Sequence, residues 1–234
     1  MNPQNLLLQW LSRRLKPDAQ TWLRDRCAQL SGGASEGVFY TVFSQSVRHA
    51  GKAPLEATTL EQAEAYAFHP GWDLSDWTRD QATRAALLLG LSGGSKTVEM
   101  ILSLHQTADL GEHLALARSL FLMPDAKALI HIAREAIRSN TGDLFAAISQ
   151  RNPYPAEHCD EIAWNQMVVK CLFVDLPLHS IYGFDQRLNA ELSRIVMALA
   201  KERRSAGRAL SSEAWLCVAP FADEEAMQLL KPEL

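Results

Sequence analysis

Apolar residues recur at intervals of three and four along nearly the whole chain, and this spacing is the strongest constraint on its fold. It is the period of an α-helix with one apolar face, whereas a half-buried strand alternates apolar and polar residues. No segment sustains that alternation. Since 47% of the residues are apolar, every helix has an apolar face to bury. The sequence therefore predicts an all-α fold.

The N-terminal third contains three predicted helices and a connecting segment. A first leucine stripe ends at Pro17, a second helix ends at Gly32, and a third spans residues 38–47. Residues 51–77 carry Pro and Gly and have a weaker pattern, with a short helical stretch at 60–66. We expect residues 1–50 to pack as N-terminal helices on a main helical array, joined to it by residues 51–77.

The main array is predicted to span residues 78–234, in one continuous domain with the rest. It opens with a capping box, in which the Thr78 hydroxyl and the Gln81 side chain each satisfy a backbone N–H. Helix starts then recur about every 15 residues, so that a two-helix unit spans about 30–35. These starts fall near Ser95, Asp109, Pro124 and Asn140. The rhythm predicts an irregular helical repeat, HEAT- or TPR-like, forming a right-handed solenoid or α-α superhelix.

Charge and composition exclude several classes of function. The chain carries 23 Lys and Arg against 27 Asp and Glu, a net charge of -4, so phosphate-backbone binding of nucleic acid is not expected. Its longest apolar runs are far shorter than the roughly 20 residues of a membrane-spanning helix, and the N-terminus lacks the features of a secretory signal. Four scattered cysteines suit free, buried thiols in a reducing compartment. The sequence predicts a cytoplasmic protein that is not an integral membrane protein.

The segment from Asn152 to Phe173 is the most unusual part of the sequence. The Asn-Pro-Tyr-Pro stretch that begins it cannot continue a helix. The helix that follows is apolar on nearly every side, which predicts a place in the centre of the fold. Its polar exceptions are Asn165, Gln166 and Lys170, which together with His158 and His179 suggest a polar pocket. The alternative is structural: Lys170 extends to solvent or pairs with Asp175 or Asp185, and the amides tie down the backbone.

Other chemical candidates are weaker. His131 and Glu135 have the spacing of two metal ligands, but such a pair without a converging third ligand is typical of a helix surface. His105 and His113 flank a helix junction. The Gly-Ser-Lys-Thr stretch at 94–97 lacks the preceding strand of a phosphate-binding loop. No metal, cofactor or nucleophile site is predicted.

Several motifs resemble the EboA family of bacterial metabolite traffic proteins. They include His-Pro-Gly-Trp-Asp at 69–73, Ala-Ile-Arg-Ser-Asn at 136–140, Asn-Pro-Tyr-Pro at 152–155, Trp-Asn-Gln-Met-Val at 164–168, Pro-Leu at 177–178 and Glu-Arg at 202–203. The resemblance runs from about Trp72 to Trp215. The chain departs from the expected pattern at Leu188, where a smaller residue was expected, and at Arg204, where an aromatic residue was expected.

The resemblance implies a gene cluster that also encodes enzyme-like proteins and a membrane prenyltransferase-like protein. Such a cluster is thought to move or process precursors of secondary metabolites, the cyanobacterial sunscreen scytonemin among them, toward the periplasm. The family brings no catalytic residues and no cofactor. The partners it implies are other proteins of the cluster and an apolar or aromatic small molecule, with a location in the cytoplasm or at the periphery of the inner membrane.

Two hypotheses follow. The first is a non-catalytic helical scaffold that binds a cluster partner or a precursor. The second is an enzyme that uses His158 and Lys170 in a central pocket on a small molecule. Membrane-surface binding through Leu7, Trp10 and Leu11 of the first helix is a weaker alternative to core packing. The candidate ligand- or partner-binding residues are Trp72, Arg138, Asn140, Asn152, Tyr154, His158, Trp164, Asn165, Gln166 and Lys170.

Overall fold

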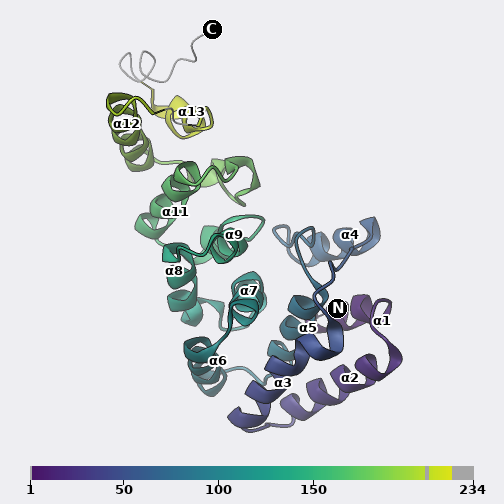
Figure 1. Ribbon diagram of the computed structural model, residues 1–234. Coiled ribbons are helices and arrows are strands. Elements are labelled where there is room, and N and C mark those ends of the chain that lie inside the picture. The colour runs from purple at the N-terminus through teal and green to yellow at the C-terminus, as the bar shows by residue number, and fades with distance from the viewer. Residues whose placement is uncertain (1, 209–210, 223–234) are drawn as a thin grey trace. The chain divides into compact units, whose positions relative to one another are not determined.

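The computed structural model describes residues 2–208 and 211–222, and within these ranges the chain is helical without a β-strand (Figure 1). The all-α prediction is confirmed. The α-helices are α1 (Pro3–Ser12), α2 (Pro17–Ser31), α3 (Glu36–Ala50), α4 (Thr59–Phe68), α5 (Arg79–Leu88), α6 (Ser95–Thr107), α7 (Leu110–Ser119), α8 (Ile130–Arg138), α9 (Gly142–Ser149), α10 (Tyr154–His158), α11 (Glu161–Phe173), α12 (Ala190–Ser205) and α13 (Ala214–Val218). Short 3-10 helices are η1 (Leu120–Leu122), η2 (Ala126–Leu129), η3 (Leu178–Ser180), η4 (Asp185–Arg187) and η5 (Ala219–Phe221).

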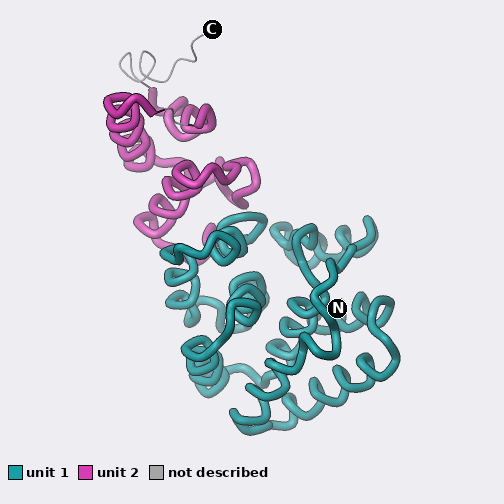
Figure 2. The backbone as a smooth tube through the Cα atoms, in the orientation of Figure 1, with its two compact units in different colours: residues 1–154 teal, residues 155–234 magenta. Residues whose placement is uncertain are grey.

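The chain divides into two compact units, residues 1–154 and residues 155–234 (Figure 2). In the first unit, α5 packs against α1, α2, α3 and α7, and the pairs α6–α7 and α8–α9 are in contact. In the second unit, α12 packs against both α11 and α13. Each unit therefore has its own set of packed helices.

The predicted helix starts hold except at Pro124. The Gln81 side chain accepts a hydrogen bond from the Thr78 backbone N–H (3.2 Å), as in a capping box, while the Thr78 hydroxyl donates to Asp80. Helices α6 and α7 begin where expected, and α9 begins two residues after Asn140. After Pro124 the chain forms only η2, and α8 begins at Ile130. Proline permits a helix start but does not force one, so local pattern alone misplaced this boundary.

Helix α5 is the centre of the first unit. Every residue from Asp80 to Leu88 is buried, although two of these side chains carry charge. Ala82, Ala85 and Ala86 are fully buried, and their small size lets the neighbouring helices approach closely. The sequence analysis placed the central helix of the fold within residues 152–173, whereas the central helix of the first unit is α5, residues 79–88.

The charged residues of α5 are paired inside this core. Arg84 donates to the Asp80 carboxylate one turn earlier (2.6 Å) and to the backbone carbonyl of Phe43 on α3 (3.2 Å). Its guanidinium also lies over the Phe43 ring, 5.4 Å from the centroid. Burial of a charge is tolerated only with such partners, because an isolated buried charge costs several kcal/mol. Arg84 thus ties α5 to α3.

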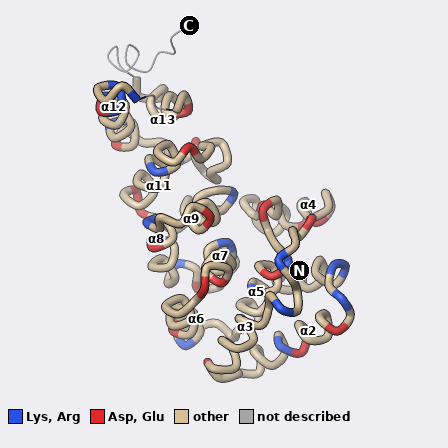
Figure 3. The backbone as a smooth tube through the Cα atoms, viewed as in Figure 1, with Lys and Arg blue, Asp and Glu red and all other residues tan. Residues whose placement is uncertain are grey.

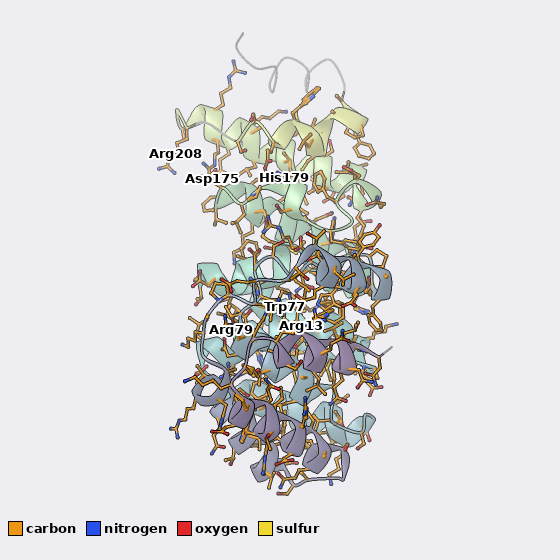
Figure 4. All side chains as sticks on the ribbon, turned by 90° about the vertical axis from the view of Figure 1, so that its right-hand side faces the viewer. Arg13, Trp77, Arg79, Asp175, His179 and Arg208 are labelled. Atoms are coloured by element: carbon orange, nitrogen blue, oxygen red, sulfur yellow. The ribbon has the colours of Figure 1, made fainter. Side chains whose placement is uncertain are left out.

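A second buried carboxylate joins α1 to α4. Glu61 is fully buried and accepts hydrogen bonds from Arg14 on the loop after α1 (2.5 Å) and from Arg13 (3.0 Å; Figure 4). It also accepts from the Thr58 backbone N–H (2.9 Å), which completes the capping box of α4. Burial alone would raise the pKa of Glu61, but the hydrogen bonds from Arg14 and Thr58 outweigh it and lower the pKa from 4.5 to about 2.

Charges of both signs are interspersed along both units rather than gathered in a block of one sign (Figure 3). Across residues 2–208 and 211–222, no helix has the length and hydrophobicity required to cross a bilayer.

Replacing Arg84 with Ala is expected to lower the free energy of unfolding by about 3–5 kcal/mol, because the Asp80 carboxylate would stay buried without its counter-charge. The double variant Asp80→Asn/Arg84→Met leaves no buried charge and should lose clearly less. Urea unfolding followed by circular dichroism measures both. Arg194→Ala breaks an exposed pair with Glu191 and serves as control, with little or no loss of stability expected. Equal losses in the single and double variants would contradict this account of α5.

The Glu61 contribution to stability should depend on pH. Because its pKa is lower in the folded state than the ordinary 4.5, the contribution is complete above 4.5 and is lost as the pH falls toward about 2. Glu61→Gln should therefore be less stable than the wild type near neutral pH, by about 3 kcal/mol. The difference should shrink on acidification. Urea unfolding over a pH series measures it, and a difference that stays constant with pH would contradict the assigned pKa.

Candidate functional site

An apolar pocket of the second unit lies between α11 and α12. It has a volume of about 390 Å³, within the range of small-molecule sites. We call it the α11–α12 groove. Its lining comprises Glu161, Ile162, Asn165, Gln166, Val169, Lys170 and Phe173 from α11, with Glu191 and Ile195 from α12.

One side of α11 is buried and the groove side is not. Trp164, Met167 and Val168 are fully buried against the unit, whereas Ile162 and Phe173 are 71% and 61% exposed. The prediction that this helix lies in the centre of the fold is therefore wrong. Apolar residues on both sides of a helix can reflect either complete burial or one buried face and one apolar surface, and the sequence cannot separate these cases.

Both ends of α11 are fixed by local hydrogen bonds. At its start, the Asp160 carboxylate accepts from the Ala163 backbone N–H (2.9 Å). At its end, Asp175 adopts a left-handed conformation (φ 56°), and the Leu176 N–H reaches back to the Cys171 carbonyl (2.9 Å). Asp175 is exposed (Figure 4) and serves to end the helix.

A reciprocal amide pair holds α11 beside α12. The Asn165 amide donates to the Asn189 side-chain oxygen (3.1 Å), and the Asn189 amide donates to the Asn165 side-chain oxygen (2.9 Å). The same Asn189 oxygen accepts from the Leu192 N–H (2.8 Å) and caps the start of α12. Asn165 is buried, so this pair fixes the floor of the groove.

Arg187 also holds α11 in place, through a contact with Trp164. Its guanidinium lies 4.6 Å from the Trp164 ring centroid and donates to the backbone carbonyls of Pro155, Ala156 and Cys159 at 2.9–3.1 Å. The Trp-Asn-Gln-Met motif at 164–167 therefore contacts the Arg-Leu-Asn motif at 187–189, although the two are 20 residues or more apart in sequence. Trp164 belongs to the framework of the site and Gln166 to its surface.

Lys170 carries the most reactive functional group of the groove lining, an amine. It is half-buried, one turn after the exposed Gln166. Desolvation lowers the pKa of Lys170 below its usual value, more than the Coulombic effect of Cys171 raises it. A larger fraction of this amine is neutral near physiological pH than of an exposed lysine.

The two histidines of the predicted pocket lie elsewhere. Neither His158 nor His179 is among the residues that line the groove. His158 lies 3.9 Å from Glu157. His179 (Figure 4) lies 3.5 Å from Glu213 and lines a second pocket of about 620 Å³ with Glu157 and Arg187. The structure therefore brings together Asn165, Gln166 and Lys170 and separates them from the histidines.

Asn152 and Tyr154 form a buried junction in the first unit. The Asn152 amide donates to the carbonyls of Ala117 and Ala147 (both 2.9 Å), and its oxygen accepts from the Tyr154 N–H (3.0 Å). The Tyr154 hydroxyl donates to the Ala126 carbonyl (2.6 Å). Both side chains are buried, so this motif connects η2, α7 and α9.

The remaining predicted residues are in the first unit. Trp72 is buried in an aromatic cluster, with ring centroids 5.2 Å from Trp10 and 6.3 Å from Trp77, so it packs the loop before α5. Burial of Trp10 agrees with core packing of the first helix. Arg138 and Asn140 are exposed at the end of α8 and just beyond it.

The sequence analysis did not identify a histidine–carboxylate cluster that the structure forms in the first unit. Glu135 on α8 contacts His131 on the same helix and His105 on α6, each at 2.7 Å, and the His113 ring on α7 lies 4.8 Å from that of His105. The hydrogen bond from His105 is the main cause that lowers the pKa of Glu135. The i,i+4 spacing of His131 and Glu135 was visible in sequence, but their pairing with His105 needed the packed helices. Within the described ranges, no group of three or more His, Cys, Asp and Glu is arranged to hold a metal ion.

The four cysteines are buried free thiols, as predicted. Desolvation is the main cause that raises the pKa of Cys27 to about 11 and that of Cys217 to about 12. These two thiols are therefore protonated at neutral pH and are poor nucleophiles.

A family model described as metabolite traffic protein EboA matches residues 3–219. No curated protein and no solved structure matches the chain. The match covers both units and includes every residue that lines the groove.

Replacing Asn165 with Ala is expected to lower the free energy of unfolding by about 1–3 kcal/mol, because the Asn189 amide loses its buried partner. Asn165→Ala and Asn189→Ala should be non-additive in a double-mutant cycle, since the two side chains are in direct contact. Urea unfolding measures each variant, with Asn140→Ala as the exposed control. Strict additivity would show that the two amides do not support each other.

Proposed function

The chain belongs to the EboA family of metabolite traffic proteins, and we propose that it is a non-catalytic helical scaffold that binds an apolar metabolite precursor in the α11–α12 groove. It acts with other proteins of its gene cluster, the membrane prenyltransferase-like protein among them, in moving or processing that precursor toward the periplasm. The ligand is an apolar or aromatic compound without a required cofactor.

The observation that carries this proposal is the exposed apolar face of α11, on which only Phe173 has a cation over its ring, that of Arg203 at 4.8 Å, among the described contacts. Ile162 and Phe173 expose most of their side chains to solvent, and Val169 and Ile195 continue the same lining. An apolar ligand that covered them would gain about 25 cal/mol for each Å² of apolar surface removed from water. A contiguous apolar surface with a few polar groups is typical of a ligand site rather than of a solvent-exposed helix.

The arrangement of the polar residues favours binding over catalysis. Lys170 and Gln166 line the groove, whereas His158 lies outside its lining, so the acid–base pair that the enzyme hypothesis requires is not assembled there. We therefore retain the scaffold as the proposed function.

The scaffold part of the proposal extends to the helix pairs of the first unit. The contacts of α6 with α7, of α8 with α9 and of α7 with both α8 and α9 support an irregular helical repeat over residues 95–149. In such repeats each pair buries its apolar stripe only against its neighbours, which suits a protein that presents surface to partners.

A groove variant tests the proposed ligand site. Ile162→Glu places a charge in the apolar lining and is expected to weaken binding of the uncharged fluorescent dye Nile red at least about tenfold. The matched control is Leu60→Glu on α4, where the wild-type side chain is 62% exposed but lies outside the groove. Fluorescence titration of the full chain measures the dissociation constants.

The biological test identifies the small molecules that the protein retains when it is purified from cells that carry the gene cluster. Mass spectrometry of extracts from the purified wild type and Leu60→Glu should show a retained apolar compound that Ile162→Glu lacks. Affinity purification from the same cells should recover proteins of the cluster. Equal probe binding by the three proteins, with neither a retained compound nor a recovered cluster protein, would contradict the proposed function.

A further inference from the structure

We propose that the pocket between α2 and α3 binds an aromatic carboxylate. It lies in the first unit and shares no residue with the α11–α12 groove, so this inference goes beyond the proposed function and does not depend on it. The pocket has a volume of about 690 Å³, within the range of small-molecule sites. We call it the α2–α3 pocket, and its lining comprises Trp22, Arg26, Gln29, Ser35, Gly37, Val38, Thr41, Val42, Gln45 and His49.

One side of each helix contributes to the lining of the α2–α3 pocket. On α2, the lining residues Trp22, Arg26 and Gln29 are spaced by four and three residues, which places them on one side of the helix. The α3 lining residues between Val38 and His49 also keep to one side. Because α2 and α3 lie side by side (Figure 1) and are in contact, the two rows face each other across the pocket.

Arg26 is the cation of the pocket, and the fold leaves most of its N–H groups without an acceptor. Within the described ranges, its guanidinium makes one hydrogen bond, from Nη1 to Gln29 Oε1 (2.5 Å), and no ion pair. Its Nε is buried and has no hydrogen-bond partner. The natural partner of such a guanidinium is a planar carboxylate, which accepts two parallel hydrogen bonds from it.

The aromatic and aliphatic part of the lining suits a flat apolar body. The rings of Trp22 and His49 are stacked, with centroids 4.0 Å apart and planes inclined by 12°. Desolvation is the main cause that lowers the pKa of His49, so this ring is largely uncharged near neutral pH. Val38 and Val42 add apolar surface. Since Trp22 stands one helical turn before Arg26, a ligand whose ring contacts Trp22 can present its carboxylate to the guanidinium.

The charge balance of the lining favours a monoanion. Among the described residues that line the pocket none is a carboxylate, and the neighbouring Asp25 and Glu36 are exposed and outside the lining. Glu36 instead accepts a hydrogen bond from the Tyr40 hydroxyl (3.4 Å). One carboxylate matches the single positive charge of Arg26, whereas a phosphate dianion would keep a negative charge without a partner in the lining.

Isothermal titration calorimetry of the full chain with 2-naphthoate and with the uncharged 2-naphthamide tests the inference. Both probes carry the same ring system, so the ratio of their dissociation constants reports the contribution of the carboxylate. The wild type should bind 2-naphthoate at least about tenfold more tightly, since the amide cannot form a charged pair with Arg26. Arg26→Met should abolish this preference. Arg24→Met is the matched control, because Arg24 is an exposed arginine of α2 outside the lining, and it should keep the preference.

Two further variants separate the α2–α3 pocket from other surfaces. Trp22→Leu should weaken both probes about fivefold through the loss of aromatic contact, whereas Ile162→Glu, which alters the α11–α12 groove, should change neither. The inference would be overturned by equal affinity of the wild type for the two probes, by no measurable binding of either, or by a preference that survives Arg26→Met. It would equally fail if Ile162→Glu rather than Trp22→Leu weakened binding. The comparison of the two probes uses the wild type alone, so it decides the anion preference even where a variant fails to fold.

Discussion

Every described helix of this protein is short, and the longest, α12, has 16 residues. Helices of this length are marginal in water by themselves, so each depends on packing against its neighbours. Packing in turn depends on pairing the polar groups that become buried. Arg84 with Asp80 and Glu61 with Arg14 are the clearest cases in the first unit, because each pair neutralises a buried charge that would otherwise destabilise the fold. Arg84 also donates to the Phe43 carbonyl on α3, and Arg14 connects the loop after α1 to α4.

The second unit uses neutral amides and a cation over an aromatic ring for the same purpose. Asn165 with Asn189 and Trp164 with Arg187 hold α11 against the segment that leads into α12. These contacts place α11, and the groove is the surface that this placement leaves open.

That placement connects the fold to the proposed function. A binding groove requires apolar side chains that the fold itself does not cover, and α11 provides them because its other side alone satisfies the core. It also sets Lys170 among apolar neighbours while the histidines face other surroundings. A site of this composition suits retention and release of an apolar compound better than proton transfer within an assembled acid–base pair.

The sequence by itself determined the helical class, several helix starts, the buried thiols and the family, because periodicity, caps and motifs are local properties of the chain. It also placed Gln166 and Lys170 on one face of a helix, since residues four apart are neighbours there. Only the tertiary structure decided that α5 is the buried helix of the first unit and that α11 keeps an apolar face open. It also brought His105 to Glu135. These outcomes depend on which surfaces of distant helices meet. The spacing of apolar residues within one helix does not show which of its faces a neighbouring helix covers.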